Sequence, residues 1–179
     1  MPALPDMVEM LLRSPLLADV DPAIRTDLAL RFETRPFTSG QTLIADGAGG
    51  RALLEILTGT AEVFVREGDH RYRVATLEPG SLVGEGAFFS GLPRAADIVG
   101  SSEGIVAVLT WNAYLNLAQS GHPGAEAIER AVVTHLTRRV KETNVRLSVL
   151  LDAQRSGGLK NALSKFFGIP TTAPVINHD

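Results

Sequence analysis

Residues 80–100 read GSLVGEGAFFSGLPRAADIVG, and this segment places two charged residues, Glu85 and Arg94, among small and apolar neighbours. Charged side chains in such a segment are costly to bury unless they meet each other or a ligand. Residues 84–89 have room for one helical turn, whose first backbone N–H groups point outward without partners. Because a guanidinium presents a planar fork to phosphate oxygens, the turn and Arg94 together predict an anion site.

The carboxylate of Glu85 restricts the kind of anion that this segment can bind. A carboxylate repels phosphate, so Glu85 should accept hydrogen bonds from a neutral group such as the hydroxyls of a sugar. Phosphate and ribose together indicate a nucleotide. The alternative is a structural ion pair between Glu85 and Arg94 that bridges two strands without a ligand.

Short runs of alternating or β-branched residues surround this segment on both sides. Most of the 17 glycines fall between residues 40 and 104, where they separate these runs. Short strands with frequent turn signals are typical of an antiparallel sandwich or roll, and residues 67–69, Glu-Gly-Asp, read as a hairpin turn. We therefore predict a mainly β fold over residues 36–110, in the form of an antiparallel sandwich or roll. The expected strands are residues 42–44, 52–57, 61–66, 72–77, 96–99 and 104–110.

The segments on either side of the roll have helical periodicity. Residues 4–17 and 22–32 predict short amphipathic helices, and Asp21-Pro22 has the composition of an N-cap and first helical position. A short helix is expected from residue 111 to 118. A longer helix without glycine or proline is expected over residues 125–155, with a length of about 45 Å at 1.5 Å per residue.

The long helix carries apolar residues at alternating three- and four-residue steps, which is a heptad seam. The seam predicts a homodimer along this helix. The alternative is that the same residues pack within one chain. The seam consists of Val133, Leu136, Val140, Thr143, Leu147 and Leu150.

Composition excludes several functions. The chain has no cysteine, so disulfides, thiolate zinc sites and cysteine nucleophiles are excluded. Its four histidines are scattered, and no serine has the spacing of a hydrolase nucleophile, so we expect neither a metal, a cofactor nor catalysis. The N-terminus lacks a targeting pattern and no apolar run is long enough for a membrane span, so a cytoplasmic protein without membrane contact is expected.

The formal net charge of −3 hides an asymmetry along the chain. Basic residues outnumber acidic ones in residues 122–165, whereas the remainder is acidic. A basic helix face is usually solvated, but it could contact DNA or a partner protein.

Residues 83–87, Val-Gly-Glu-Gly-Ala, followed by residues 93–98, Pro-Arg-Ala-Ala-Asp-Ile, resemble the phosphate-binding cassette of the cyclic-nucleotide-binding domain family. This family includes catabolite activator protein and the regulatory subunits of protein kinase A. The resemblance extends to residues 36–44 and 77–80, and in all spans about residues 11–152. It implies a jelly-roll-like β-roll flanked by N-terminal helices and a long C-terminal helix, with cAMP or cGMP as the ligand.

The resemblance also implies roles for residues of the cassette, by which we mean residues 83–98. Arg94 would pair with the cyclic phosphate, and the backbone N–H groups of Ala87 and Ala95 would be further donors. Glu85 would accept a hydrogen bond from the ribose 2′-hydroxyl, and Gly84 would also contact the ribose.

The long helix resembles the dimer helix of catabolite activator protein, which places Thr143 and Asn144 at base-contacting positions. Alanine at position 95, in place of a hydroxyl residue, favours adenine over guanine.

Two residues depart from the family pattern. Gly86 stands where an aliphatic residue is usual, which predicts a looser helical turn. Asp97 stands where threonine is common, and strand alternation predicts that its side chain faces solvent.

We therefore interpret the sequence as a stand-alone, non-catalytic cyclic-nucleotide sensor over residues 1–155, with a short C-terminal helix and flexible tail over residues 156–179. Only 27 residues follow Asp152, fewer than the roughly 60 that a helix-turn-helix domain would need. Direct DNA binding is thus not expected, and an unknown protein partner would receive the signal. The alternatives are a ligand-free dimerisation or interaction module with a vestigial pocket, or a transcription-associated regulator.

Overall fold

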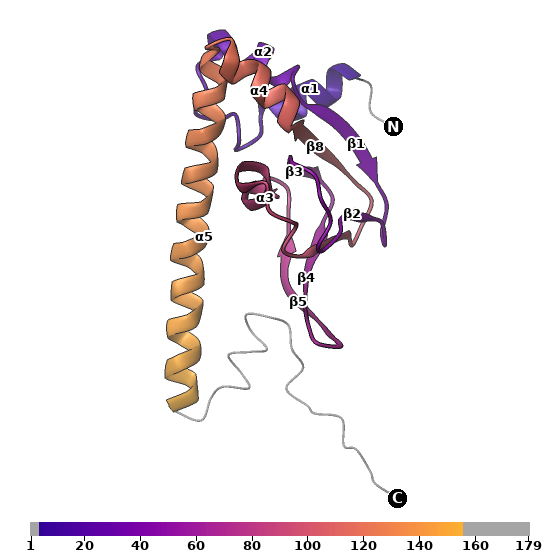
Figure 1. Ribbon diagram of the computed structural model, residues 1–179, viewed down its shortest axis with the longest axis vertical. Helices are drawn as coiled ribbons and strands as arrows, with labels where there is room; N and C mark the ends of the chain where they lie inside the picture. The colour runs from indigo at the N-terminus through magenta and orange to yellow at the C-terminus, as the bar shows by residue number, and fades with distance from the viewer. Residues whose placement is uncertain (1–3, 156–179) are drawn as a thin grey trace, which may run out of the picture. The chain divides into compact units, whose positions relative to one another are not determined.

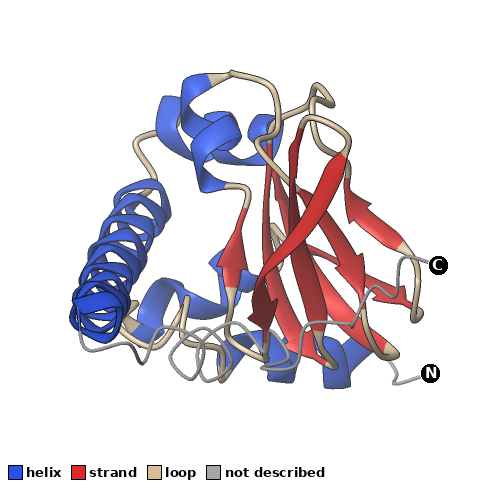
Figure 2. Cartoon of the chain, turned by 90° about the horizontal axis from the view of Figure 1, so that it is seen from below, coloured by secondary structure: helices blue, strands red, loops and turns tan. Residues whose placement is uncertain are grey.

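The computed structural model of the chain describes residues 4–155. Its strands form two four-stranded antiparallel sheets, which are red in Figure 2, and three of the helices lie at the end of the roll where β1 begins and β8 ends (Figure 1). The elements are α1 (Leu4–Leu12), α2 (Pro22–Ala29), β1 (Glu33–Phe37), β2 (Thr42–Ile44), β3 (Ala52–Thr58), β4 (Ala61–Glu67), β5 (His70–Leu77), β6 (Leu82–Val83), α3 (Glu85–Ser90), β7 (Asp97–Gly100), β8 (Gly104–Thr110), α4 (Trp111–Gln119) and α5 (Pro123–Arg155).

The order of strands confirms the expected antiparallel β-roll with flanking helices. One sheet has the order β1-β8-β3-β6 and the other β2-β7-β4-β5. The β4–β5 hairpin turns at the predicted place, where Gly68 adopts a φ of 58°. The short helix and tail expected over residues 156–179 lie outside the described residues.

Two strands were not expected from the sequence. β1 is a largely exposed edge strand that contains Pro36, and proline is tolerated in sheets only at such edges. It begins at Glu33, so the roll starts before the expected residue 36. β6 has only two residues, too few to leave a periodic pattern in the sequence.

The N-terminal helices are shorter than expected, for reasons that the sequence contains. α1 ends at Leu12 instead of residue 17, because Ser14 precedes Pro15 and a residue before proline avoids the helical region. α2 begins as predicted: the Asp21 carboxylate accepts a hydrogen bond from the Ala23 N–H at 2.9 Å. It ends at Ala29, and the chain then enters β1.

Two apolar clusters form the core. One lies inside the roll and includes Phe37, Ile56 and Ile98. The other joins the outer face of the β1-β8-β3-β6 sheet to the helices and includes Leu17, Leu53 and Phe88. Phe88 belongs to α3, so the helix that the cassette forms is anchored in the second cluster.

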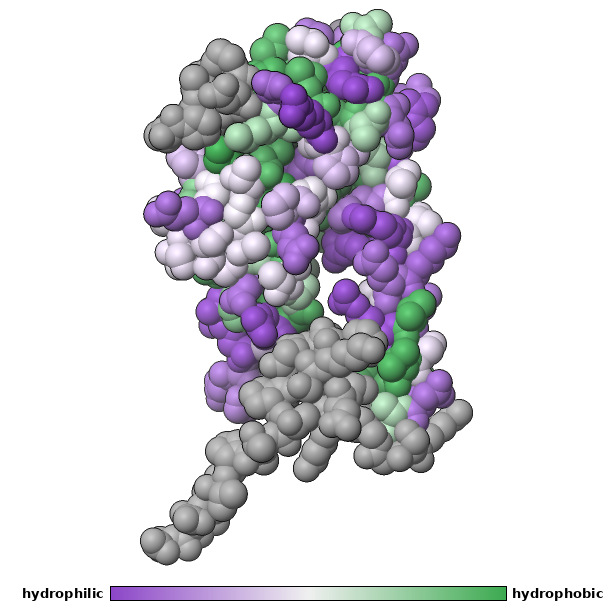
Figure 3. All heavy atoms as spheres, turned by 180° about the vertical axis from the view of Figure 1, so that it is seen from behind, coloured by the Kyte–Doolittle hydropathy of each residue, from purple (hydrophilic) through white to green (hydrophobic). Residues whose placement is uncertain are grey.

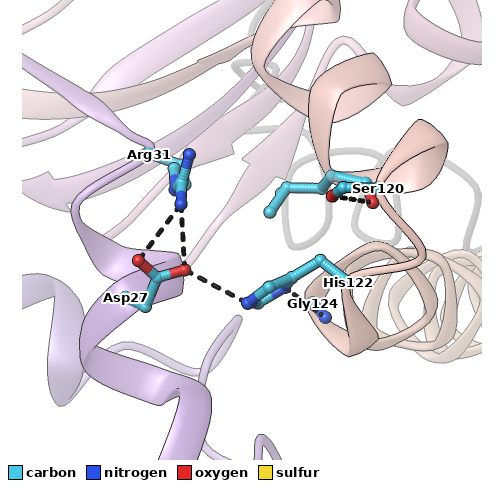
Figure 4. A network of polar contacts seen from close by, with 6 residues as sticks. Asp27, Arg31, Ser120, His122 and Gly124 are labelled. Carbon is cyan, nitrogen blue, oxygen red and sulfur yellow. Dashed lines mark hydrogen bonds and ion pairs between the residues drawn. The ribbon is translucent and has the colours of Figure 1, made fainter.

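The junction between α4 and α5 is tied to α2 by a polar network (Figure 4). His122 Nε2 lies 3.1 Å from an Asp27 carboxylate oxygen, and Arg31 Nη2 lies 3.2 Å from both oxygens of the same carboxylate. The other ring nitrogen of His122 accepts from the Gly124 N–H at 2.9 Å, so this histidine caps the first turn of α5.

The chain divides into two compact units, Met1–His135 and the remainder from Leu136. The first unit contains the roll, the helices α1 to α4 and the beginning of α5. The described part of the second is the rest of α5, which runs without interruption to Arg155 as the sequence predicted. None of the helices described combines the length and apolar character needed to cross a bilayer.

Glu55 is a buried carboxylic acid on β3, with only 1% of its surface exposed. Its Oε1 atom accepts a long hydrogen bond of 3.4 Å from the Leu16 N–H, and its Oε2 atom has no partner. Burial raises the pKa of Glu55 to about 7, and the nearby Ser14 hydroxyl and the Leu16 N–H offset this only partly. The carboxylate form is therefore costly in the folded protein.

We expect the stability of the protein to fall between about pH 4.5 and pH 7 through Glu55. In this window the folded state keeps a proton on Glu55 that the unfolded state releases, so raising the pH favours unfolding. Glu55→Gln removes this titration. Its stability relative to the wild type should therefore rise between pH 5 and pH 8 by up to about 3 kcal/mol, as measured by urea unfolding.

The control is Glu67→Gln, which changes an exposed carboxylate at the end of β4. Its stability relative to the wild type should be the same at both pH values. An equal stability difference for Glu55→Gln at pH 5 and pH 8 would contradict the prediction.

Candidate functional site

The start of α3 is built around Gly84, which caps the helix in a left-handed conformation with φ of 86°. A side chain at this position would place its Cβ atom 2.6 Å from Arg94 Nη1 and 2.7 Å from the Ala52 carbonyl oxygen. Only glycine fits both the backbone conformation and the space. The guanidinium of Arg94 therefore lies directly against the first turn of α3.

Backbone carbonyls hold the Arg94 side chain in place. Its Nη1 donates to the Gly84 carbonyl at 3.2 Å and its Nη2 to the Ala52 carbonyl at 3.0 Å. The side chain is buried, with 8% of the residue exposed. These contacts fix the guanidinium between β3 and α3 without consuming all five of its N–H donors.

The charge of Arg94 is retained despite its burial. Burial lowers the pKa of the guanidinium, and the negative charge of Glu85 opposes that change. An arginine stays protonated in proteins under all ordinary conditions. The site therefore presents a fixed positive charge, and a buried charge of this kind is costly unless it meets an opposite one.

The remaining cassette residues stand around this charge. Glu85 is the first residue of α3 and is buried, with 8% exposed. The Phe88 N–H donates to the Gly84 carbonyl at 2.9 Å and is the first N–H bonded within the turn, so the Ala87 N–H lies in the part of the turn that has no acceptor within the helix. Ala95 is exposed and follows Arg94 directly. Arg94, Glu85 and the first turn of α3 are thus brought together, and the binding of a phosphate there remains a prediction.

The sequence that contains this site matches a known family. The family model described as cyclic nucleotide-binding domain matches residues 34–120, which include the whole cassette and the strands that hold it. Residues 34–120 match the cyclic nucleotide-binding domain family. Over 103 residues, or 58% of its length, the chain is 34% identical to a cAMP-dependent protein kinase regulatory subunit of Colletotrichum orbiculare, and it spans 26% of that protein. The chain thus spans only about a fifth to a quarter of the length of the curated relatives that it matches.

Solved structures with the same fold include bacterial proteins. A cyclic nucleotide-binding domain from Methylobacillus flagellatus superposes with a TM-score of 0.70 at 24% identity, covering 79% of this chain and 80% of that one. The catabolite activator protein of Thermus thermophilus gives a TM-score of 0.64 at 22% identity, covering 88% and 82%. At these identities the two structures establish the fold of the cyclic nucleotide-binding domain.

The two departures from the family pattern have different outcomes. Gly86 is exposed, and a Cβ atom built there would meet nothing within 4 Å. The looser helical turn expected from this glycine remains a prediction. The prediction that Asp97 faces solvent is wrong. Asp97 has 8% of its surface exposed and accepts a hydrogen bond from the Asp46 N–H at 2.9 Å. Strand alternation does turn it away from Ile98, but neighbouring arginine side chains cover it.

Sequence reasoning missed Arg51, which anchors the far end of the cassette helix. Its Nε donates to the Phe88 carbonyl at 2.7 Å and its Nη2 to the Phe89 carbonyl at 3.0 Å. Its guanidinium also lies 3.2 Å from the centre of the Trp111 ring, which in turn contacts both phenylalanines edge to face. No spacing in the sequence links residue 51 to residues 88–111, so only the fold brings them together.

The residues expected to contact the base and to form the dimer lie mostly in the second unit. Thr143 and Asn144 are exposed residues of α5. Their contact with a base remains a prediction. Hydrophobic side chains are exposed along the lower part of α5 (Figure 3). The exposed seam residues are Val133, Leu136, Val140, Thr143 and Leu147, and Leu150 is half-buried.

Proposed function

We propose that this chain is a non-catalytic sensor that binds a cyclic nucleotide, cAMP or cGMP, in the cassette. The observation that carries the proposal is the buried guanidinium of Arg94, held by two carbonyls against a glycine-capped turn. The cyclic phosphate would bind Arg94 and the N–H groups of Ala87 and Ala95. A fixed guanidinium is well suited to this task, since little entropy is lost when it binds a phosphate.

Glu85 and Gly84 would bind the ribose in this proposal. Glu85 is the first residue of the turn and is buried beside the arginine, so its carboxylate could accept from a ribose hydroxyl without reaching into solvent. Ala95 has no hydroxyl to hold a guanine, which favours cAMP over cGMP. Thr143 and Asn144 of α5 would contact the base.

Calorimetric titration of the full chain with cAMP and with cGMP tests the proposal. A second readout is available because the single tryptophan, Trp111, contacts Phe88 of the cassette helix, so its fluorescence should respond to binding. Saturable binding of either nucleotide is expected. An absence of binding at millimolar concentrations of both nucleotides would reject the sensor function.

The alternative is an interaction module with a vestigial pocket. The observation that favours it is the exposed apolar character of α5, which includes Val140 at 58% exposure and Leu147 at 53%. A protein that dimerises through these residues but binds neither nucleotide would fit this alternative. A transcription-associated regulator is a third candidate, because basic residues accumulate toward the C-terminal part of the sequence.

We further propose that α5 forms a homodimer and passes the signal to another protein. A heptad seam with exposed aliphatic residues supports this, since such residues gain stability when a second helix covers them. In this proposal residues 1–155 form the sensing domain. Binding would shift α5 between two arrangements by as much as the ligand's affinities for them differ.

Leu136→Glu should dissociate such a dimer. The substitution puts a carboxylate at a seam position. Burying this charge against a second helix would cost more free energy than dimerisation provides. Analytical ultracentrifugation at micromolar protein should then give a monomer where the wild type gives a dimer. The control is Val145→Glu, because Val145 is equally aliphatic and 62% exposed but lies outside the seam. A wild type that sediments as a monomer, or equal sedimentation of the two variants, would argue against the seam.

A further inference from the structure

A cluster of charged side chains surrounds Asp97, the first residue of β7, which follows Arg94 by three positions. The buried Asp97 carboxylate accepts from the Asp46 N–H at 2.9 Å through Oδ1. Its Oδ2 atom lies 3.4 Å from Arg71 Nε and 3.7 Å from Arg66 Nη2. Both arginines belong to the β4–β5 hairpin, which is distant in sequence from the cassette.

The hydrogen bond from Asp46 to Asp97 completes a series that runs along the backbone of Arg94. The Gly47 N–H donates to the Arg94 carbonyl at 2.8 Å, and the Arg94 N–H donates to the Ala48 carbonyl at 3.0 Å. Asp97 thus adds a third bond between the loop after β2 and the chain that carries the guanidinium. The position of the Arg94 backbone depends on this loop.

The charge of Asp97 opposes the function proposed for Arg94. Three residues of chain span at most about 10 Å, so the Cα atoms of Asp97 and Arg94 are separated by no more than about one Debye length. Unopposed, the Asp97 carboxylate would repel an anionic ligand. Two arginines face this one carboxylate, which leaves the cluster without net negative charge.

We propose that Asp97 is a positioning residue for Arg94, and that Arg66 and Arg71 preserve the affinity for an anionic ligand by neutralising Asp97. The proposal rests on the proposed binding of a cyclic nucleotide to the cassette. It makes the β4–β5 hairpin, which contributes none of the expected cassette ligands, a determinant of affinity. Arg66 and Arg71 would affect affinity by neutralising the charge of Asp97. Asp97 would affect it by accepting from the Asp46 N–H and so holding the loop after β2 against the backbone of Arg94.

Five variants separate these two roles. Arg66→Gln/Arg71→Gln leaves the Asp97 charge uncompensated, and adding Asp97→Asn to it removes that charge. Asp97→Asn alone keeps an acceptor for the Asp46 N–H, whereas Asp97→Ala removes it. The control is Arg35→Gln/Arg73→Gln, which also removes two arginines that pair with carboxylates, Glu33 and Glu62, but not with Asp97.

The dissociation constant for cAMP, and for cGMP if that nucleotide binds more tightly, is measured by calorimetry at low and high salt. The double arginine variant should bind about threefold to tenfold more weakly at low salt, and less so at 0.5 M salt because the charges are then screened. Adding Asp97→Asn should restore affinity to within about twofold of Asp97→Asn alone. Asp97→Ala should bind up to about tenfold more weakly than Asp97→Asn.

The outcomes are distinguishable from a failure of the proposed function. A wild type that binds neither nucleotide rejects the proposed function and this inference with it. If the wild type binds, equal affinities of the double arginine variant and its control overturn the inference alone. The inference is also overturned if adding Asp97→Asn to the double arginine variant does not restore affinity. A loss of thermal stability without a salt-dependent loss of affinity would mean that the cluster is only structural.

If the double variant does not fold, Arg66→Gln alone, at a residue with a 63% exposed side chain, makes the same test.

Discussion

Replacing Arg94 with alanine is expected to weaken cyclic-nucleotide binding by about 10-fold to 100-fold. A hydrogen bond to a charged group contributes about 1.5–3 kcal/mol, and each 1.4 kcal/mol is about a factor of ten in affinity. The guanidinium is already held by the Gly84 and Ala52 carbonyls, so its removal takes away a prearranged charge. Calorimetric titration with cAMP and cGMP measures the effect.

Two further variants define the cause of the loss. Arg94→Lys keeps the charge but loses the planar fork, so its affinity should lie between those of the wild type and Arg94→Ala. Arg73→Ala is the matched control, because Arg73 is paired with Glu62 on the β4–β5 hairpin and is not part of the cassette. Unchanged binding by Arg94→Ala in a protein that binds the nucleotide would reject the assignment of the phosphate site.

Replacing Gly84 with alanine is expected to reduce both stability and affinity. The new Cβ atom would lie 2.6 Å from Arg94 Nη1 and 2.7 Å from the Ala52 carbonyl oxygen, so the guanidinium or the backbone must move. The left-handed conformation itself costs a non-glycine residue about 1–2 kcal/mol, and overpacking adds about 1–3 kcal/mol. Urea unfolding and nucleotide titration measure the two effects separately.

Gly91→Ala provides the control for backbone strain. Gly91 ends the same helix, with φ of 72°, and a Cβ atom there would meet nothing within 4 Å. This variant should lose only the stability that the left-handed conformation costs, and its nucleotide affinity should stay close to that of the wild type. If the two glycine variants lose affinity equally, the contact between Gly84 and Arg94 does not position the arginine.

A helix or strand could be predicted from the sequence only where its apolar pattern extended over many residues. The long run of residues 125–155 has many periods of apolar residues and no glycine or proline, so α5 was predicted almost to its ends. β6 has two residues, and β1 is an exposed edge strand with a proline, so neither gave a recognisable alternation. Local propensity decides an element only where enough neighbouring residues agree.

The candidate site was predicted for a similar reason. Glu85 and Arg94 stand out because charged residues are rare in a small and apolar segment, and the segment is short enough to bring them together. Arg51 and the partners of Asp97 did not stand out, because their roles depend on strands far away in the sequence. The prediction that Asp97 faces solvent was wrong because alternation gives the direction of a side chain but not what covers it.

The sequence alone determined a mainly antiparallel β fold and the flanking helices, because these depend on glycine spacing and apolar periodicity. The order of small and charged residues in residues 83–98 carries the resemblance to a phosphate-binding cassette. Tertiary structure decided how the cassette is held. The carbonyl of Ala52, the guanidinium of Arg51 and the side chains of Arg66 and Arg71 reach it from other strands. Hydrogen bonds and charge pairs form between groups that the fold brings within a few ångströms, and no pattern along the chain records that distance.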